Sequence, residues 1–113
     1  MLTLEQFKNA RSVLQGVLRP TPLIHSPYLS KSCGNNVYLK PENMQVTGAY
    51  KIRGAYFKIS TLTQEEKERG LVTASAGNHA QGVAYAAQAA GVTATIVMPT
   101  TTPLVKVNNT KDY

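Results

Sequence analysis

The 113-residue sequence is poor in cysteine and has no long apolar run. Its one cysteine, Cys33, cannot form an internal disulfide bond or supply a cysteine-based metal cluster. We expect it to be a half-buried small residue. No segment approaches the roughly 18 apolar residues that span a bilayer, and the first residues lack the layout of a secretory signal. These absences predict a cytoplasmic protein with no metal site and no membrane partner.

The sequence is also poor in acidic residues, with six Asp and Glu against twelve Lys and Arg, a net charge of +6. Such an excess suits nucleic acid, a membrane surface or an anionic small molecule. The basic residues are scattered, however, and no recognition helix, zinc spacing or aromatic basic strand accompanies them. We therefore expect a solvated surface excess and no nucleic-acid partner. Retention on a nucleic-acid column that falls steeply with salt would support the opposite interpretation.

The composition, 42% hydrophobic and 16% charged, is that of one folded domain. Capping boxes begin helices at Thr3 and Thr63, and glycines end others. The pattern predicts helices over residues 3–19, 26–34, 49–60, 63–70 and 78–90, and strands over residues 37–40, 71–74 and 93–98. A last helix starts near Thr102, and the chain barely enters it. Strands that alternate with helices predict an α/β fold with a parallel sheet and right-handed crossovers.

The first candidate site lies where the strand over residues 37–40 leads, through a loop, into the helix over residues 49–60. Lys51 stands at the start of this helix, where the helix dipole and Arg53 both favour a neutral amine. A neutral amine attacks a carbonyl, so Lys51 is a candidate Schiff-base former. From chemistry alone an exposed helix lysine is the commoner outcome. Glu42 in the loop either orients the lysine loop or is a solvated charge, and the solvated charge is the commoner outcome.

The second candidate site is the loop of small residues between the strand over residues 71–74 and the helix over residues 78–90. Free N–H groups at such a helix start hold a carboxylate or a phosphate. The loop is neither a G-x-G-x-x-G fingerprint nor a P-loop. The plain alternative is an ordinary N-cap, with Asn78 bonding the helix backbone. His79 either touches substrate or is simply a hydrogen-bonded histidine at the helix start.

Taken together, residues 47–55 (TGAYKIRGA) and residues 75–82 (SAGNHAQG) resemble the threonine dehydratase (threonine ammonia-lyase) and serine dehydratase family. These are pyridoxal-phosphate enzymes of fold type II, which is similar to tryptophan synthase β. The resemblance covers nearly the whole chain. It implies a partial three-layer α/β fold with a parallel sheet, and residues 1–113 as the truncated N-terminal portion of the catalytic domain.

The resemblance also implies roles for individual residues. Lys51 would bind pyridoxal 5′-phosphate covalently and act as the base that removes the α-proton of the substrate. Asn78 would bond the phenolic 3′ oxygen of the cofactor. Tyr50, where the family commonly has Phe, would pack on the cofactor ring, although its hydroxyl needs a partner or water. The substrate carboxylate would be held by Ser75, Gly77, Asn78 and His79.

The reaction that the resemblance implies is β-elimination of an amino acid. L-Threonine would give 2-oxobutanoate and ammonia, in threonine catabolism or isoleucine biosynthesis, and L-serine would give pyruvate. The full-length protein would be a homo-oligomer. Related serine racemases carry a second serine where this chain has Ala76, which cannot transfer a proton, so elimination is favoured over racemisation. The residues after Lys51 likewise disfavour the cysteine synthase branch.

Two family features do not occur before Tyr113: the glycine-rich loop for the cofactor phosphate and the Ser or Cys partner of the pyridine nitrogen. We therefore expect the 113-residue chain to bind cofactor poorly and to turn over little substrate by itself. A serine racemase, another enzyme of fold type II and a non-catalytic interaction fragment stay open as alternatives.

Overall fold

The computed structural model describes all 113 residues, which form six α-helices, four short strands and one 3-10 helix. The helices are α1 (Leu4–Leu14), α2 (Pro27–Cys33), α3 (Lys51–Ser60), α4 (Gln64–Arg69), α5 (Asn78–Ala90) and α6 (Leu104–Lys111). The strands are β1 (Ile24–His25), β2 (Tyr38–Leu39), β3 (Leu71–Ala74) and β4 (Ala94–Val97), and the 3-10 helix η1 is Glu42–Met44. The mixed α/β class predicted from the sequence is confirmed.

The strands form two separate pairs. β3 and β4 are parallel, with Leu71 opposite Ala94 and Ala74 opposite Val97, and α5 makes the crossover between them. β1 and β2 are antiparallel, with Ile24 opposite Leu39. The strand expected over residues 37–40 therefore does not belong to the parallel sheet. Its partner β1 was not predicted, because two residues are too few to show an alternating pattern.

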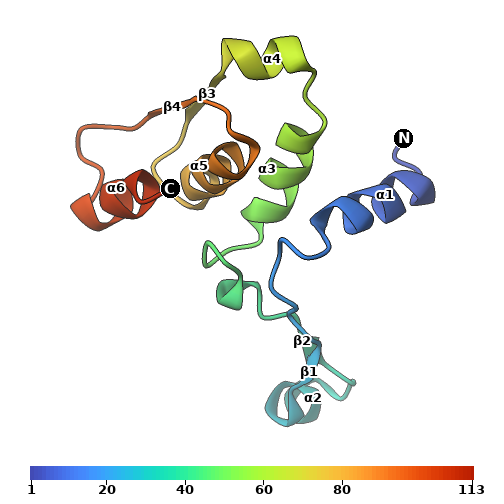
Figure 1. The fold of residues 1–113 in the computed structure, drawn as a ribbon. Coiled ribbons are helices and arrows are strands. Elements are labelled where there is room, and N and C mark those ends of the chain that lie inside the picture. Colours follow the sequence, from blue (N-terminus) through green and yellow to red (C-terminus); the bar gives the residue numbers. More distant parts are fainter.

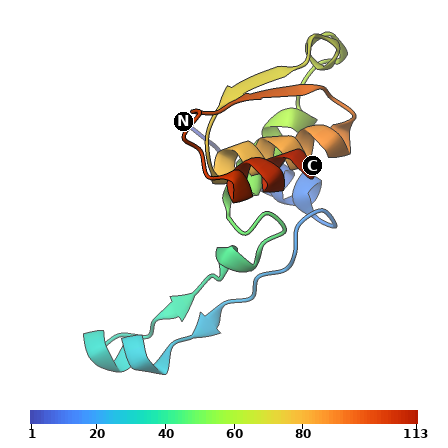
Figure 2. The ribbon, with the colours of Figure 1, turned by 90° about the vertical axis from the view of Figure 1, so that its left-hand side faces the viewer.

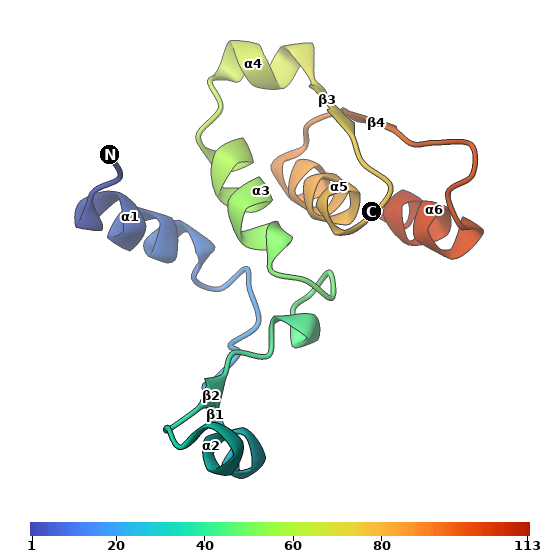
Figure 3. The same ribbon diagram turned by 180° about the vertical axis from the view of Figure 1, so that it is seen from behind.

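Helix α5 lies at the centre of the main body (Figure 1). β3 and β4 pass over one side of α5, while α3 and α6 flank it, and α1 lies on the far side of α3 (Figure 3). Residues 22–40 form an arm, made of β1, α2 and β2, that projects away from this body (Figure 2). The arm explains why the radius of gyration is 16.7 Å, when a compact chain of this length has about 13 Å.

The apolar core is the contact between α3 and α5. Its six buried residues come in equal parts from the two helices: Ile52, Ala55, Ile59, Val83, Ala86 and Ala87. The helices approach closely at Gly82, where a Cβ atom would lie 3.3 Å from the backbone N of Ile52 and 3.4 Å from the carbonyl carbon of Lys51. The first turn of α3 is therefore held directly against α5.

The local signals at the helix ends are largely confirmed. Both capping boxes form, at Thr3 with Gln6 and at Thr63 with Glu66, and α2 begins and ends as predicted. Two helix lengths were wrong. α1 ends at Leu14 and not near Arg19, since Gly16 takes a left-handed φ of 85°, and α6 extends over eight residues where only its first residues were expected.

Much apolar surface stays outside this core. The accessible surface is 7975 Å², against about 6,100 Å² for a compact monomer of the same mass. Val72 and Val97, on β3 and β4, are 79% and 54% exposed. Cys33, expected to be half-buried, is exposed at the end of α2. No helix combines the length and the apolar character needed to cross a bilayer.

We predict that Ile52→Ala lowers the free energy of unfolding by about 2–5 kcal/mol, the cost of a cavity at a buried aliphatic side chain. Ile52 is fully buried between α3 and α5. Urea unfolding followed by circular dichroism measures the loss. The matched control is Ile24→Ala on the arm, where the side chain is 52% exposed. Equal losses for both variants would contradict the assignment of the core.

Candidate active site

Lys51 is the first residue of α3, and its side chain is exposed. It lines an open hollow of about 440 Å³ together with Tyr50, Arg53, Gly54, Ala55 and His79. His79 is the second residue of α5, so the hollow is lined by residues from both sequence motifs. A primary amine at the edge of an open hollow is accessible to a carbonyl compound of small size.

The start of α5 is capped by Ser75 and not by Asn78. The interpretation of Asn78 as an ordinary N-cap residue was therefore wrong. The N-cap residue of this helix is Gly77, which has no side chain. Ser75 Oγ accepts hydrogen bonds from the backbone N–H groups of Gly77 at 3.3 Å and Ala80 at 3.2 Å. Between them, the N–H groups of Asn78 and His79 have no intrahelical acceptor. These two donors lie at the positive end of a 13-residue helix.

The residues with expected roles therefore divide into two groups. Tyr50, Lys51 and His79 line the hollow. The residues at the start of α5, Ser75, Gly77 and Asn78, do not line this hollow. The close approach at Gly82 holds α5, which begins with Asn78 and His79, against α3, which begins with Lys51. Tyr50 is 62% exposed, so its ring face is open to a ligand.

Glu42, expected to be a solvated charge, is instead the centre of a polar network. Its carboxylate accepts two hydrogen bonds from Arg53, at 2.8 Å from Nε and 2.7 Å from Nη2, and one from Thr21 Oγ1 at 2.6 Å. The pKa of Glu42 is lowered to about 2, and the hydrogen bonds from Arg53 are the largest cause. Burial opposes the shift, while the hydrogen bond from Thr21 and the charges of Arg53 and Lys40 add to it. Arg53 is therefore half of an ion pair and not an isolated charge beside Lys51.

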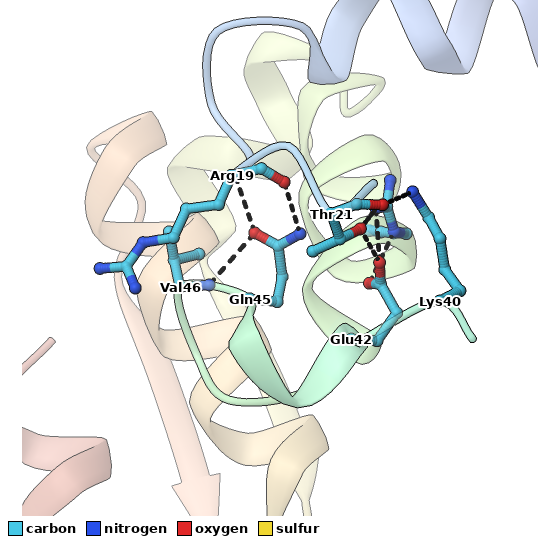
Figure 4. A network of polar contacts seen from close by, with 7 residues as sticks. Arg19, Thr21, Lys40, Glu42, Gln45 and Val46 are labelled. Atoms are coloured by element: carbon cyan, nitrogen blue, oxygen red, sulfur yellow. Dashed lines mark hydrogen bonds and ion pairs between the residues drawn. The ribbon is translucent and has the colours of Figure 1, made fainter. Parts of the chain in front are cut away.

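Two further residues near this network, Lys40 and Gln45, were not expected to be structural (Figure 4). Lys40 Nζ donates to the carbonyl oxygen of Thr21. Gln45, 3% exposed, uses its amide to bond both the N–H and the carbonyl group of Arg19, at 2.9 and 3.1 Å. The base of the arm is thus joined to the loop before α3. No local sequence pattern marks these contacts, because their partners lie 19 and 26 residues apart.

We predict that the ion pair makes stability depend on pH below 4.5. The folded pKa of Glu42 is lowered from 4.5 to about 2, so its contribution is present above pH 4.5 and is lost as the pH falls toward 2. Glu42→Gln should flatten this part of the pH dependence in urea unfolding experiments. Glu65→Gln, on the exposed surface of α4, is the control. An unchanged slope in Glu42→Gln would contradict the prediction.

Comparison with known proteins agrees with this arrangement. The profile of the family described as pyridoxal-phosphate dependent enzyme matches residues 14–113. The chain is 54% identical over 112 residues to L-threonine ammonia-lyase of Thermotoga maritima. The alignment covers 99% of this chain and 28% of the relative. It is 52% identical over 114 residues to the catabolic L-threonine dehydratase TdcB of Staphylococcus aureus, covering all of this chain and 33% of that one.

Solved structures are similar over the whole chain as well. The serine racemase of Dictyostelium discoideum matches with a TM-score of 0.92 and 36% identity, over 99% of this chain and 37% of the racemase. Threonine deaminase isoform 2 of Solanum lycopersicum matches with a TM-score of 0.81 and 41% identity, over 99% and 32%. The chain thus spans about a third of the length of its relatives. By profile, sequence and fold alike, it belongs to the family of pyridoxal-phosphate-dependent enzymes.

Proposed function

We propose that this chain provides the lysine and the carboxylate-binding loop for deamination of L-threonine to 2-oxobutanoate and ammonia, with L-serine as a second substrate. The observation that carries the proposal is that Lys51 and His79, from separate motifs, line one hollow. Both curated relatives described above are named for action on L-threonine. An amino acid is therefore the substrate class that the similarity supports.

The residues around the hollow fit pyridoxal phosphate, which has an aldehyde, an aromatic ring and acidic oxygens. Lys51 offers an accessible amine for the aldehyde, and the exposed ring of Tyr50 lies beside it as a packing surface. Asn78, exposed at the first position of α5, offers an amide for the 3′ oxygen. When bound, the cofactor supplies an electron sink that acidifies the α-proton of an amino acid.

The chain's own residues then orient the substrate and move its proton. The unbonded N–H groups of Asn78 and His79 bind the carboxylate, which the positive end of α5 favours by its dipole. Lys51 Nζ takes the α-proton, and as an amine held near that carbon it acts at high effective concentration. With a proton from water the β-hydroxyl group would then leave as water, and hydrolysis of the remaining C–N bond would release the 2-oxo acid and ammonia.

Racemisation of serine is the second candidate, because a serine racemase matches the fold with a TM-score of 0.92. Racemisation requires a proton donor on the face of the substrate opposite Lys51. In this chain Ala76 follows Ser75 in the loop before α5, and its methyl group donates no proton. This difference in the chain supports elimination over racemisation.

We predict that a chimera will deaminate L-threonine when residues 1–113 replace the matching segment of the Thermotoga maritima relative. Lys51→Ala in the chimera should lower the release of 2-oxobutanoate by about 10²–10⁴-fold, the loss expected when a positioned base is removed. Lys58→Ala, later in α3, is the matched control. Full activity of the Lys51→Ala chimera would refute the proposal.

The same chimera distinguishes the alternatives. Incubation with L-serine should yield pyruvate with little D-serine, as chiral chromatography measures, because Ala76 cannot reprotonate the substrate. Predominant formation of D-serine would establish the racemase instead. For a non-catalytic interaction fragment, neither product would form, and pyridoxal phosphate would give the chain no absorbance that depends on Lys51.

A further inference from the structure

The start of α3, where Lys51 lies, lacks the local contacts that fix other helices of this chain. α1 and α4 both begin with capping boxes. The N-cap residue of α3 is Tyr50, which makes no side-chain capping bond, and no acidic residue stands in the first turn. Because the first N–H groups of a helix have no internal acceptor, an uncapped start frays readily. Contacts from elsewhere in the chain must therefore hold Lys51 in place.

The ion pair of Arg53 with Glu42 provides such a contact in the same helical turn. Arg53 is two residues after Lys51, and its guanidinium meets the carboxylate through two hydrogen bonds of 2.7 and 2.8 Å. A fork of this kind fixes orientation as well as distance. The Glu42 side chain is only 17% exposed, so solvent weakens the pair less than it weakens an exposed pair.

Glu42 is itself held by the base of the arm. Thr21, 4% exposed, donates its hydroxyl hydrogen to the carboxylate at 2.6 Å. Lys40 donates a hydrogen bond to the carbonyl group of the same threonine. Figure 4 shows that the side chains of Glu42 and Lys40 both meet Thr21. The carboxylate is therefore a fixed partner for Arg53, and not a mobile charge on a loop.

The other ion pairs of the chain do not join separate segments. Lys8 with Glu5 and Arg69 with Glu65 are each within one helix, and their side chains are 62–80% exposed. Pairs of this kind add little to stability. Only the pair of Glu42 with Arg53 connects separate segments of the chain, and it does so beside the candidate lysine.

Building on the proposed function, we propose that Glu42 and Arg53 are positioning residues for Lys51. Their ion pair, supported by Thr21 and Lys40, holds the first turn of α3 so that the Lys51 amine stays at the hollow beside His79. Neither residue needs to touch the substrate. Losing the pair should loosen the lysine without unfolding the core between α3 and α5.

The test measures how selectively pyridoxal phosphate reacts with Lys51 in the chimera, after bound cofactor has been removed. After brief exposure and reduction with borohydride, peptide mass spectrometry gives the ratio of labelled Lys51 to labelled Lys58, a second exposed lysine on α3. We expect Glu42→Gln to lower this ratio about tenfold, since loss of orientation alone costs this much or more. Arg53→Lys, which keeps the charge but not the fork, should lower it less. The control Glu65→Gln should leave it unchanged.

A second readout covers the case in which Glu42→Gln fails to fold. In the chimera, Arg53→Lys should lower kcat for L-threonine several-fold with little change in KM, the result expected when a reacting group is displaced but substrate binding is retained. Circular dichroism and urea unfolding confirm that each variant keeps its helices. A change in stability alone, with the labelling ratio and kcat unaltered, would overturn the positioning role.

The outcomes separate this inference from the proposed function. If Lys51 in the otherwise unchanged chimera is labelled no faster than Lys58, Lys51 is not the lysine that reacts with the cofactor, and both proposals fail. If Lys51 is labelled selectively, and folded Glu42→Gln and Arg53→Lys keep the same ratio, the proposed function stands and the positioning role is wrong. A ratio that falls in Glu42→Gln and is partly kept in Arg53→Lys supports both.

Discussion

The close approach of α5 to α3 at Gly82 is the constraint on which the candidate site depends. A Cβ atom at this position would lie 3.3 Å from the backbone N of Ile52 and 3.4 Å from the carbonyl carbon of Lys51, which is tighter than most side chains tolerate. Without a side chain there, the backbone of the first turn of α3 lies directly on α5. The start of α5, with its free N–H groups, is thereby brought to the same region as the lysine.

This packing explains why the core is small yet sufficient to organise the site. Alanine and glycine on α5 let two helices come close, and Ile52 and Ile59 fill the remaining space. The contact is apolar and has no direction of its own. Orientation around it must come from polar contacts, and the network of Arg53, Glu42 and Thr21 supplies them at the end of α3 where Lys51 lies.

The features that were predictable are those with local causes. The capping boxes at Thr3 and Thr63, the glycine that ends α5 and the strand Leu71–Ala74 all follow from neighbours within a few residues. The two motifs that surround Lys51 and His79 were recognisable for the same reason. Where a local signal competed with another, prediction was weaker: apolar spacing continued to Leu18, but the left-handed Gly16 ended α1 at Leu14.

By itself the sequence determined the α/β class, most of the helices, the membership in a family and the identity of the candidate lysine. Only the tertiary structure decided that the strand at Tyr38–Leu39 pairs with Ile24–His25 outside the parallel sheet, and that Glu42 is the half-buried partner of Arg53. The physical reason is one of distance along the chain. Helix signals arise between residues three or four apart, whereas Thr21 and Arg53 are 32 residues apart and meet only after the chain has folded.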